Sequence, residues 1–369
     1  MRTSSVTKPT VVVVAPEERS EKLLRLLNIY DDDRIVYTSF EQGAAGRTLG
    51  RRTLLSPTSI DFKSVEHVLI SSFDVFQEYP DIHSELASRG FPREKVTSIF
   101  QPHQTLLTLE RLFGFPYKSN RDLAQAIIFN DVFERLNYAY GAILAVEQAR
   151  RLDLAGVTLV ETGVWTGRGL RNLCEWASVL RHTFDLDVQV SGFDTGAGLP
   201  KCTDWRDHPE LWQEGEMVMP DLNLLRSQLP SFCTLEIGDV AETVPRYLQQ
   251  SNLKSRPIGF FALDVDLYTS SVDALKLLEG HPETLLPAVG IWIDDSYVNV
   301  MQNNFCGEAL AIAEYNHRNH LRKIDPKKVR PNHQPMLWHY CFAFAHIFDH
   351  PVRQGQRPSA LIGFNHCDY

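Results

Sequence analysis

A βαβ pattern between residues 157 and 194 is the strongest structural signal in the chain. The apolar run at residues 157–160 is typical of a buried strand, and a second run covers residues 188–193. Between them, apolar residues at helical spacing predict one buried helix face: Leu170, Leu173, Cys174, Ala177 and Leu180. A glycine-containing turn joins the first run to this helix. The pattern therefore predicts a strand, a turn, a helix and a second, parallel strand, as in nucleotide-binding sheets.

Three more apolar runs continue this domain, at residues 235–239, 258–263 and 288–293. Helical patterns follow the first two runs, and the hydroxyl residues 269–271 predict an N-terminal cap for the second of these helices. Four successive strands end in acids, namely Asp194, Asp239, Asp264 and Asp294. In a parallel sheet the carboxyl ends of the strands share one edge, where ligands bind. Repulsion among these carboxylates requires compensation, which a cationic cofactor, sugar hydroxyls or a divalent metal would each provide.

Residues 10–103 repeat the βαβ pattern on a smaller scale. Apolar runs predict strands at residues 11–14, 34–37, 65–70 and 96–100, with helices at 21–27 and 82–88. This order predicts a small parallel sheet with helices outside it. No glycine fingerprint follows Val14, so no nucleotide is assigned to this domain. The segment 42–52 is rich in glycine and arginine, and a mobile loop is favoured there over an anion site.

Residues 104–153 read as helices that connect the two α/β regions. One apolar face lies within residues 106–113, and a longer helical pattern at 124–150 is interrupted near residues 137–141. Helices just before such a βαβ unit often cover a cofactor, which makes Tyr138 and Tyr140 weak candidates for a pocket. A place in the core is favoured for both aromatic rings. We therefore predict a small α/β domain at 1–103, a helical connector or lid at 104–153, and a second α/β domain at 154–369.

Composition and charge narrow the class of protein. The chain has 369 residues, of which 43% are hydrophobic and 22% charged, as in soluble globular proteins of more than one domain. Its net charge of −9 gives no general attraction to nucleic acid or to anionic membranes, and its apolar runs are too short to cross a bilayer. Six scattered cysteines and a start without secretory features favour reduced thiols and a cytoplasmic location.

The turn after the first strand of the second domain indicates the charge of a ligand. Its glycines are spaced G-x-x-x-G-x-G rather than G-x-G-x-x-G, and Glu161 precedes them. A carboxylate there would repel the pyrophosphate of NAD, whereas it would favour the cationic S-adenosylmethionine. Gly163 and Gly167 would let the backbone approach this ligand, and Asp194 would accept the ribose hydroxyls. The alternative is that the glycines only form a tight turn.

The predicted cofactor-binding residues all lie at or near the ends of the first four strands of the second domain. They are Glu161, Thr162, Gly163, Trp165, Gly167, Asp194, Thr195, Gly238, Asp239 and Asp264.

A metal site is expected at the same edge. Asp264, Asp294 and Asp295 follow two strands that we expect to be neighbours, and three carboxylates suit a hard cation such as Mg²⁺. Such a metal would acidify a substrate hydroxyl and hold it opposite the methyl donor. The alternative is that these acids only cap helices or fringe the sheet. Asp264, Asp266 and His208 are the candidates for the catalytic base, and the choice stays open.

Near the carboxyl end of the chain, a group of metal-binding residue types is an alternative candidate for a metal site, in this case for zinc. It comprises His339, Cys341, His346 and His350. Their spacing resembles that of zinc ligands. Aromatic residues alternate with them, however, and favour a packed helix instead.

With these residues placed, the second domain resembles class I S-adenosylmethionine-dependent methyltransferases, and most closely the macrocin O-methyltransferase family. Five segments carry the resemblance in order, at residues 161–167, 192–200, 237–245, 263–268 and 293–295. It implies an α/β fold, with a Rossmann-like, mostly parallel sheet and helices on both faces, preceded by the small N-terminal domain. It also implies a Mg²⁺ site from Asp264, Asp294 and Asp295. Some relatives carry a histidine base where this chain has Leu267, and the N-terminal domain is outside the family's common core.

The resulting prediction is an S-adenosylmethionine-dependent O-methyltransferase, assisted by Mg²⁺, acting on a hydroxyl of a sugar or other small natural product. One alternative is a metal-independent N- or carboxyl-methyltransferase. Another is a catalytically silent, cofactor-binding scaffold, which would have no need of Glu161, Asp194 and the metal acids. We expect a small-molecule substrate, no nucleic-acid or membrane partner, and a homo-oligomer.

Overall fold

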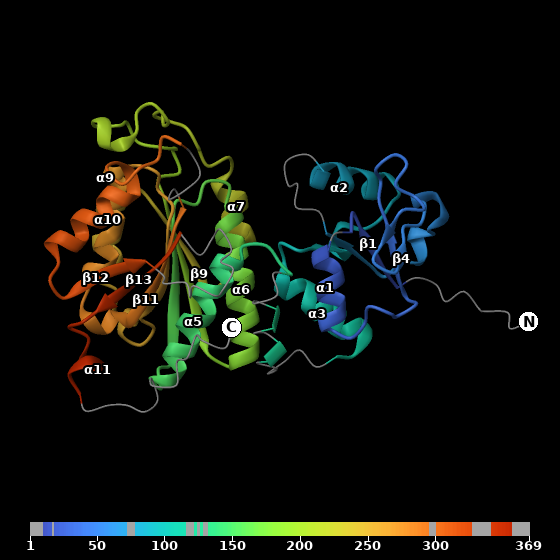
Figure 1. The fold of residues 1–369 in the computed structure, drawn as a ribbon, viewed down its shortest axis with the longest axis horizontal. Helices are drawn as coiled ribbons and strands as arrows, with labels where there is room; N and C mark the ends of the chain where they lie inside the picture. Colours follow the sequence, from blue (N-terminus) through green and yellow to red (C-terminus); the bar gives the residue numbers. More distant parts are fainter. Residues whose placement is uncertain are drawn as a thin grey trace, which may run out of the picture. The chain divides into compact units, whose positions relative to one another are not determined.

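The computed structural model describes residues 10–16, 18–71, 78–115, 122–123, 126–127, 132–294, 300–326 and 341–355 (Figure 1). The chain divides into two compact units, Met1–Leu136 and Asn137–Tyr369. The division falls within the predicted connector. The first unit is built on a parallel sheet and the second on a mostly parallel one. Among the helices that are described, none has both the length and the apolar character needed to cross a membrane.

The first unit contains a four-stranded parallel sheet in the order β2-β1-β5-β6. Its strands are β1 (Val11–Val14), β2 (Ile35–Thr38), β5 (His67–Ile70) and β6 (Val96–Ser98). Its helices are α1 (Glu18–Leu26), α2 (Glu78–Ser88) and α3 (Pro102–Phe113). Valines and isoleucines of β1 and β5 form a core with the apolar face of α2. The predicted small parallel sheet is confirmed, and the glycine-rich segment includes a short hairpin of β3 (Thr48–Leu49) and β4 (Arg52–Thr53).

The second unit contains a seven-stranded sheet in the order β12-β13-β11-β10-β7-β8-β9. The parallel strands are β7 (Gly156–Thr162), β8 (Asp187–Asp194), β9 (Cys233–Ile237), β10 (Ile258–Leu263) and β11 (Leu285–Ile293). β13 (Phe342–Ile347) runs antiparallel to both β11 and β12 (Arg322–Pro326). The strand order reverses between β7 and β10, because the chain adds β8 and β9 on one side and β10 and β11 on the other. Such a switch point is where open α/β sheets bind ligands.

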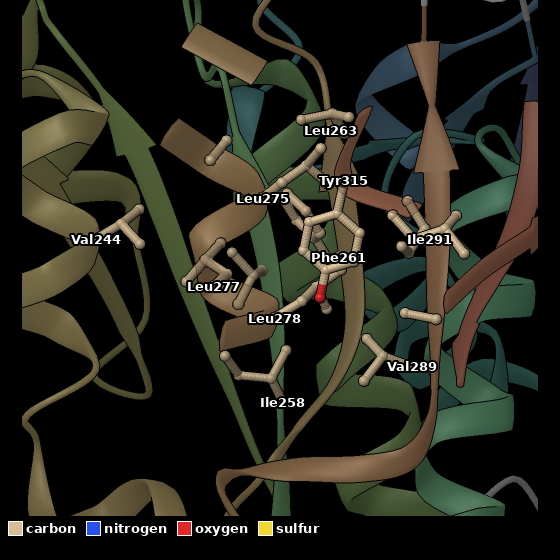
Figure 2. Close-up of a cluster of buried hydrophobic side chains, with 14 of the residues drawn as sticks. Val244, Ile258, Phe261, Leu263, Leu275, Leu277, Leu278, Val289, Ile291 and Tyr315 are labelled. Atoms are coloured by element: carbon tan, nitrogen blue, oxygen red, sulfur yellow. The ribbon is translucent and has the colours of Figure 1, made fainter. Parts of the chain in front are cut away.

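Helices cover both faces of this sheet. On one face lie α5 (Leu136–Arg151) and α6 (Arg168–Phe184), which both approach the side chain of Glu161 in β7. On the other lie α8 (Val240–Tyr247), α9 (Tyr268–Ala274) and α10 (Gly307–Arg318). Figure 2 shows Phe261 of β10 packed on this second face among Leu275, Leu278 and Tyr315. The structure thus confirms the expected α/β fold class, a Rossmann-like, mostly parallel sheet with helices on both faces, preceded by a small α/β unit.

The remaining elements of the second unit are short connections. They are η4 (Trp205–Asp207), α7 (Leu222–Gln228), η5 (Ser251–Lys254), η6 (Leu275–Glu279), η7 (Pro282–Thr284) and α11 (Pro351–Gln354). The first unit has three similar single turns, η1 (Pro57–Ser59), η2 (Phe62–Ser64) and η3 (Arg93–Lys95).

Two expectations about secondary structure were wrong. The predicted interruption near residues 137–141 is misplaced, because the non-helical break lies just before it, at residues 132–135, and α5 runs through 137–141. A Cβ on Gly141 would lie 2.1 Å from Cδ2 of Phe260, so packing against β10 explains this glycine. The predicted packed helix near His346 is the strand β13. The rings of Phe344 and His346 within the strand, and of Phe348 just after it, succeed one another at every second residue. Alternation with small and apolar residues suits a strand better than a helix.

Candidate cofactor and metal site

The carboxyl ends of four parallel strands meet in register at the switch point. Leu263 of β10 pairs with Ile293 of β11 and with Thr162 of β7, which in turn pairs with Phe193 of β8. The residues that follow are Asp264, Asp294, Gly163 and Asp194. Neighbouring strands lie about 4.8 Å apart, so these four residues form one continuous edge. The expected convergence of acids from separate strands is therefore present.

Glycines shape the turn between β7 and α6. Gly163 has φ +83° and donates its N–H to the carbonyl of Phe193 at 2.9 Å. A Cβ at this position would lie 1.5 Å from the carbonyl oxygen of Asp264. Gly167 has φ +76°, and a Cβ there would lie 2.3 Å from Leu225 of α7. Both positions exclude side chains through backbone conformation and close protein neighbours.

Glu161 places a buried carboxylate beside the first turn of α6. Its Oε1 accepts a hydrogen bond from the hydroxyl of Tyr138 at 2.7 Å. A Cβ on Gly169, the second residue of α6, would lie 1.9 Å from the same oxygen. The amino end of a 17-residue helix favours negative charge, which lowers the cost of burying this group. The role of Gly169 was missed, although it is the third glycine of the turn. The bond to Tyr138 was missed because nothing in the sequence pairs the two residues.

Asp194 ties the ends of β7 and β8 together. Its Oδ2 accepts the N–H groups of Val164 and Trp165, each at 2.8 Å, and its Oδ1 accepts that of Gly196 at 2.6 Å. A carboxylate offers about four acceptor positions, so these bonds leave room for about one further donor. Asp194 is therefore both the anchor of the glycine turn and a candidate acceptor for one ribose hydroxyl.

The other predicted cofactor residues surround this anchor. The hydroxyls of Thr162 and Thr195 each donate to a backbone carbonyl, at 3.1 and 2.7 Å. Gly238, with φ +137°, donates its N–H to the carbonyl of Asp194 at 2.9 Å. Asp239 is exposed and caps α8 by accepting an N–H at 2.9 Å. Trp165 has φ +45° and its side chain is 41% exposed at the rim of the turn, where it is available to contact a ligand.

The described part of the proposed metal site consists of Asp264 and Asp294. Both are half-buried at the ends of adjacent strands, and Oδ1 of Asp294 accepts the indole N–H of Trp292 at 3.0 Å. Asp295 lies outside the described residues. Within the residues that are described, no three acid, histidine or cysteine side chains form a metal-binding group. Hard carboxylate oxygens on neighbouring strands fit the donor set that Mg²⁺ requires.

A further carboxylate at this edge, Glu308 in the first turn of α10, was missed by sequence reasoning. Its side chain is 2% exposed, and its Oε1 accepts the N–H of Val265 at 3.3 Å. Burial raises the pKa of the Cys341 thiol to about 11, and the charges of Asp294 and Glu308 act in the same direction. Glu308 follows Val265 by 43 residues, so only the folded structure brings it to the end of β10.

His208 and Asp266, two of the candidate bases, come together where α10 begins. Both are buried and both have positive φ, +54° and +59°. A Cβ on Gly307 would lie 3.4 Å from the imidazole of His208 and 3.5 Å from the carbonyl of Asp266. Nδ1 of His208 lies 2.7 Å from Oε1 of Glu210, and this hydrogen bond holds the pKa of the Glu210 carboxyl below its usual range. Strained backbone of this kind is concentrated at functional sites.

Comparisons with solved structures return methyltransferases. The calicheamicin methyltransferase CalS11 is similar with a TM-score of 0.40 and 21% identity, over 66% of this chain and 91% of that chain. The O-methyltransferase NovP gives 0.39 and 17%, over 56% and 79%. An O-methyltransferase from Bacillus cereus in complex with SAH gives 0.33 and 11%, over 68% and 99%. No family model matches the chain, and no curated protein matches its sequence. Likenesses this distant decide neither reaction nor substrate.

Proposed function

We propose that the second unit is an S-adenosylmethionine-dependent O-methyltransferase that acts, with Mg²⁺, on a hydroxyl of a sugar or other small natural product. The observation that carries this proposal is the acidic edge at the switch point. Glu161, Asp194, Asp264 and Asp294 all lie within or directly after strands paired in register. Ligands bind at this place in such sheets, and a ligand with positive charge and hydroxyls is the one that four carboxylates favour.

The residues fit a sulfonium cofactor better than a dinucleotide. Glu161 is buried next to the glycine turn, where the pyrophosphate of a dinucleotide would have to lie. The carboxylate of Glu161 and the pyrophosphate would repel each other strongly in a desolvated site. The positive charge of S-adenosylmethionine would instead be balanced by Glu161. Asp194 would accept a hydrogen bond from a ribose hydroxyl at its remaining acceptor position.

The catalytic requirements are alignment of the acceptor hydroxyl and removal of its proton. Asp264 and Asp294, with Asp295, would hold a magnesium ion, which when bound supplies charge that acidifies a hydroxyl of the acceptor. Asp266 and His208 lie at the same end of the sheet and are the groups to which the hydroxyl proton would pass. Leu267 stands where some relatives of the macrocin O-methyltransferase family have a histidine. Asp266 and His208 are therefore the candidate bases to test.

Calorimetry on the full chain tests this proposal in two steps. S-adenosylhomocysteine should bind with a micromolar or lower Kd, and NAD⁺ should give no heat. Asp294→Asn should weaken Mg²⁺ binding at least tenfold while changing the affinity for S-adenosylhomocysteine less than twofold. The control is Asp273→Asn, which removes an α9 carboxylate that pairs with Lys276 at 2.5 Å.

The outcomes separate the alternatives. Binding of S-adenosylhomocysteine without Mg²⁺ binding would favour a metal-independent N- or carboxyl-methyltransferase. Binding of both, with no methyl transfer to any hydroxylated acceptor, would favour a silent scaffold. Absence of S-adenosylhomocysteine binding to the wild-type chain would overturn the proposal.

A further inference from the structure

The segment of residues 199–217 is a compact loop between β8 and α7. Its ends are closed by two backbone bonds, from the N–H of Leu199 to Glu216 at 2.7 Å and from that of Gly215 to Leu199 at 2.9 Å. A Cβ on Gly198 would lie 2.3 Å from the carbonyl of Glu216, so the closure leaves no space for a side chain there. Loops with such close ends pack on themselves and are frequently functional.

One carboxylate joins this loop to the residues that follow β10. Asp207 is 0% exposed. Its Oδ1 accepts from the N–H and the hydroxyl of Thr269 in α9, at 2.8 and 3.0 Å. Its Oδ2 accepts from the N–H and the hydroxyl of Thr203 within the loop, at 2.7 and 2.8 Å. The predicted cap of α9 by its own hydroxyl residues was wrong, because the helix begins at Tyr268 and its second N–H is bound by Asp207.

The burial of this charge has a structural consequence. A buried carboxylate is costly unless hydrogen bonds replace its hydration, and four donors here do so. Two of the donors belong to the loop and two to α9, so the carboxylate is satisfied only while the loop is docked. An asparagine in its place would direct its side-chain NH₂ group at the N–H and hydroxyl donors of either Thr203 or Thr269. The two hydrogen bonds to that threonine would then be lost.

The residues on either side of Asp207 are the ones that docking of the loop holds in place. Arg206 lies 4.4 Å from the ring centre of Tyr268 and donates to its hydroxyl at 3.1 Å. His208, the next residue, is buried against Gly307 close to the carbonyl of Asp266. The loop thus meets α9 and α10 at three consecutive residues, and the third is a candidate base.

From this arrangement we infer that Asp207 is a positioning residue for the acceptor side of the active site. It fixes His208 beside Asp266 by docking the loop on α9, and it touches neither the cofactor nor the reacting atoms. The assignment of a catalytic purpose to this arrangement rests on the proposed function. The docking itself can be tested without a substrate.

The test compares Asp207→Asn with Asp204→Asn in the full chain. Asp204 lies in the same loop but is partly exposed and pairs with Arg206 at 2.8 Å, so it controls for loss of a loop carboxylate. Hydrogen exchange followed by mass spectrometry should show at least tenfold faster exchange of residues 199–212 and 267–271 in Asp207→Asn. Exchange in β7 and β10 should not change, and Asp204→Asn should behave as the wild type.

A second readout reports on His208 itself. In protein labelled with ¹⁵N-histidine, the ring signals of His208 are assigned among the 13 histidines as those lost in His208→Gln. Wild type and Asp204→Asn should show one fixed tautomer, with Nδ1 donating to Glu210, whereas Asp207→Asn should show averaged ring shifts. The Kd of S-adenosylhomocysteine should stay within twofold in all three proteins.

The results separate the inference from the proposed function. Unchanged exchange and unchanged His208 signals in Asp207→Asn would overturn the inference, whatever the protein binds. Thr269→Val, which removes one donor and keeps the helix, should give a smaller change in the same direction, and no change there would also count against it. Absence of S-adenosylhomocysteine binding in the wild type would instead refute the proposed function and leave the docking result intact.

Discussion

The two units of this protein contain similar parallel sheets with different chemistry at their carboxyl edges. In the first unit the residues directly after β2, β5 and β6 are Ser39, Ser71 and Ile99. In the second unit, Asp264 and Asp294 follow β10 and β11, and β8 ends at Asp194. The architecture is shared, so it cannot by itself assign a ligand to either unit. The comparison shows that the side chains after the strands carry the functional information.

Polar side chains at the carboxyl edge of the first sheet form hydrogen bonds with nearby backbone groups. Thr38 donates to the carbonyl of Leu55 at 2.8 Å, and the hydroxyl of Ser39 accepts the N–H of Glu41 at 3.1 Å. The carboxylates of the second edge also hold turns, and they bring negative charge to that edge. We therefore expect perturbations of the second edge to alter ligand binding and those of the first to alter stability alone.

The largest effect is expected where the second edge is most crowded. Gly163→Ala adds a Cβ 1.5 Å from the carbonyl of Asp264 at φ +83° and should cost about 3–5 kcal/mol of unfolding free energy. All six tryptophans lie in the second unit, so fluorescence during urea unfolding reports on that unit. Gly215→Ala is the control, since its φ of +81° is similar but no atom lies within 4 Å of the added Cβ. Equal losses in the two variants would show that the contact with Asp264 is unimportant.

The first unit should lose stability in acid through His67. This buried imidazole in β5 lies 2.7 Å from the hydroxyl of Thr97, and burial lowers its pKa from 6.5 to about 4. The unfolded state therefore takes up the proton first, so stability present above pH 6.5 is lost as the pH falls towards 4. The loss should be on the order of 3 kcal/mol. Hydrogen exchange of β1 and β5 at several pH values should show it, and His67→Gln should remove the dependence.

A change at the anchor of the second edge should affect the cofactor. Asp194→Ala removes the acceptor for three backbone N–H groups and, under the proposed function, for a ribose hydroxyl. Charge-assisted hydrogen bonds contribute about 1.5–3 kcal/mol, so the affinity for S-adenosylhomocysteine should fall roughly 10- to 100-fold. Calorimetry measures this directly. An unchanged Kd would mean that the edge does not hold the cofactor.

The smallest effect is expected at the corresponding place in the first unit. Ser71→Ala replaces a buried hydroxyl directly after β5, and the Kd of S-adenosylhomocysteine should remain within about twofold of wild type. The same titration as for Asp194→Ala provides the measurement. A tenfold loss of affinity would contradict the assignment of the cofactor to the second unit alone.

The strands and their acidic ends could be predicted because both signals are local. Apolar runs fix a strand, and parallel strands necessarily bring their carboxyl ends to one edge. The contact of Glu308 with Val265 and the bonds of Asp207 to Thr269 could not be predicted, because these partners are 43 and 62 residues away in the chain. Gly141 was misread for a similar reason: inside α5, its purpose is to admit Phe260 from β10. Local patterns report the conformation of a segment, whereas such contacts depend on which segments pack together.

The contact between Gly163 and the carbonyl of Asp264 has one more consequence. The turn assigned to the methyl donor and the residue assigned to the metal touch through backbone atoms, so neither can shift without displacing the other. Two ligands bound there would be thermodynamically linked, and each would change the affinity of the other by the same factor. The coupling between the two ligands would then be a property of the backbone, set at a position where only a hydrogen atom fits.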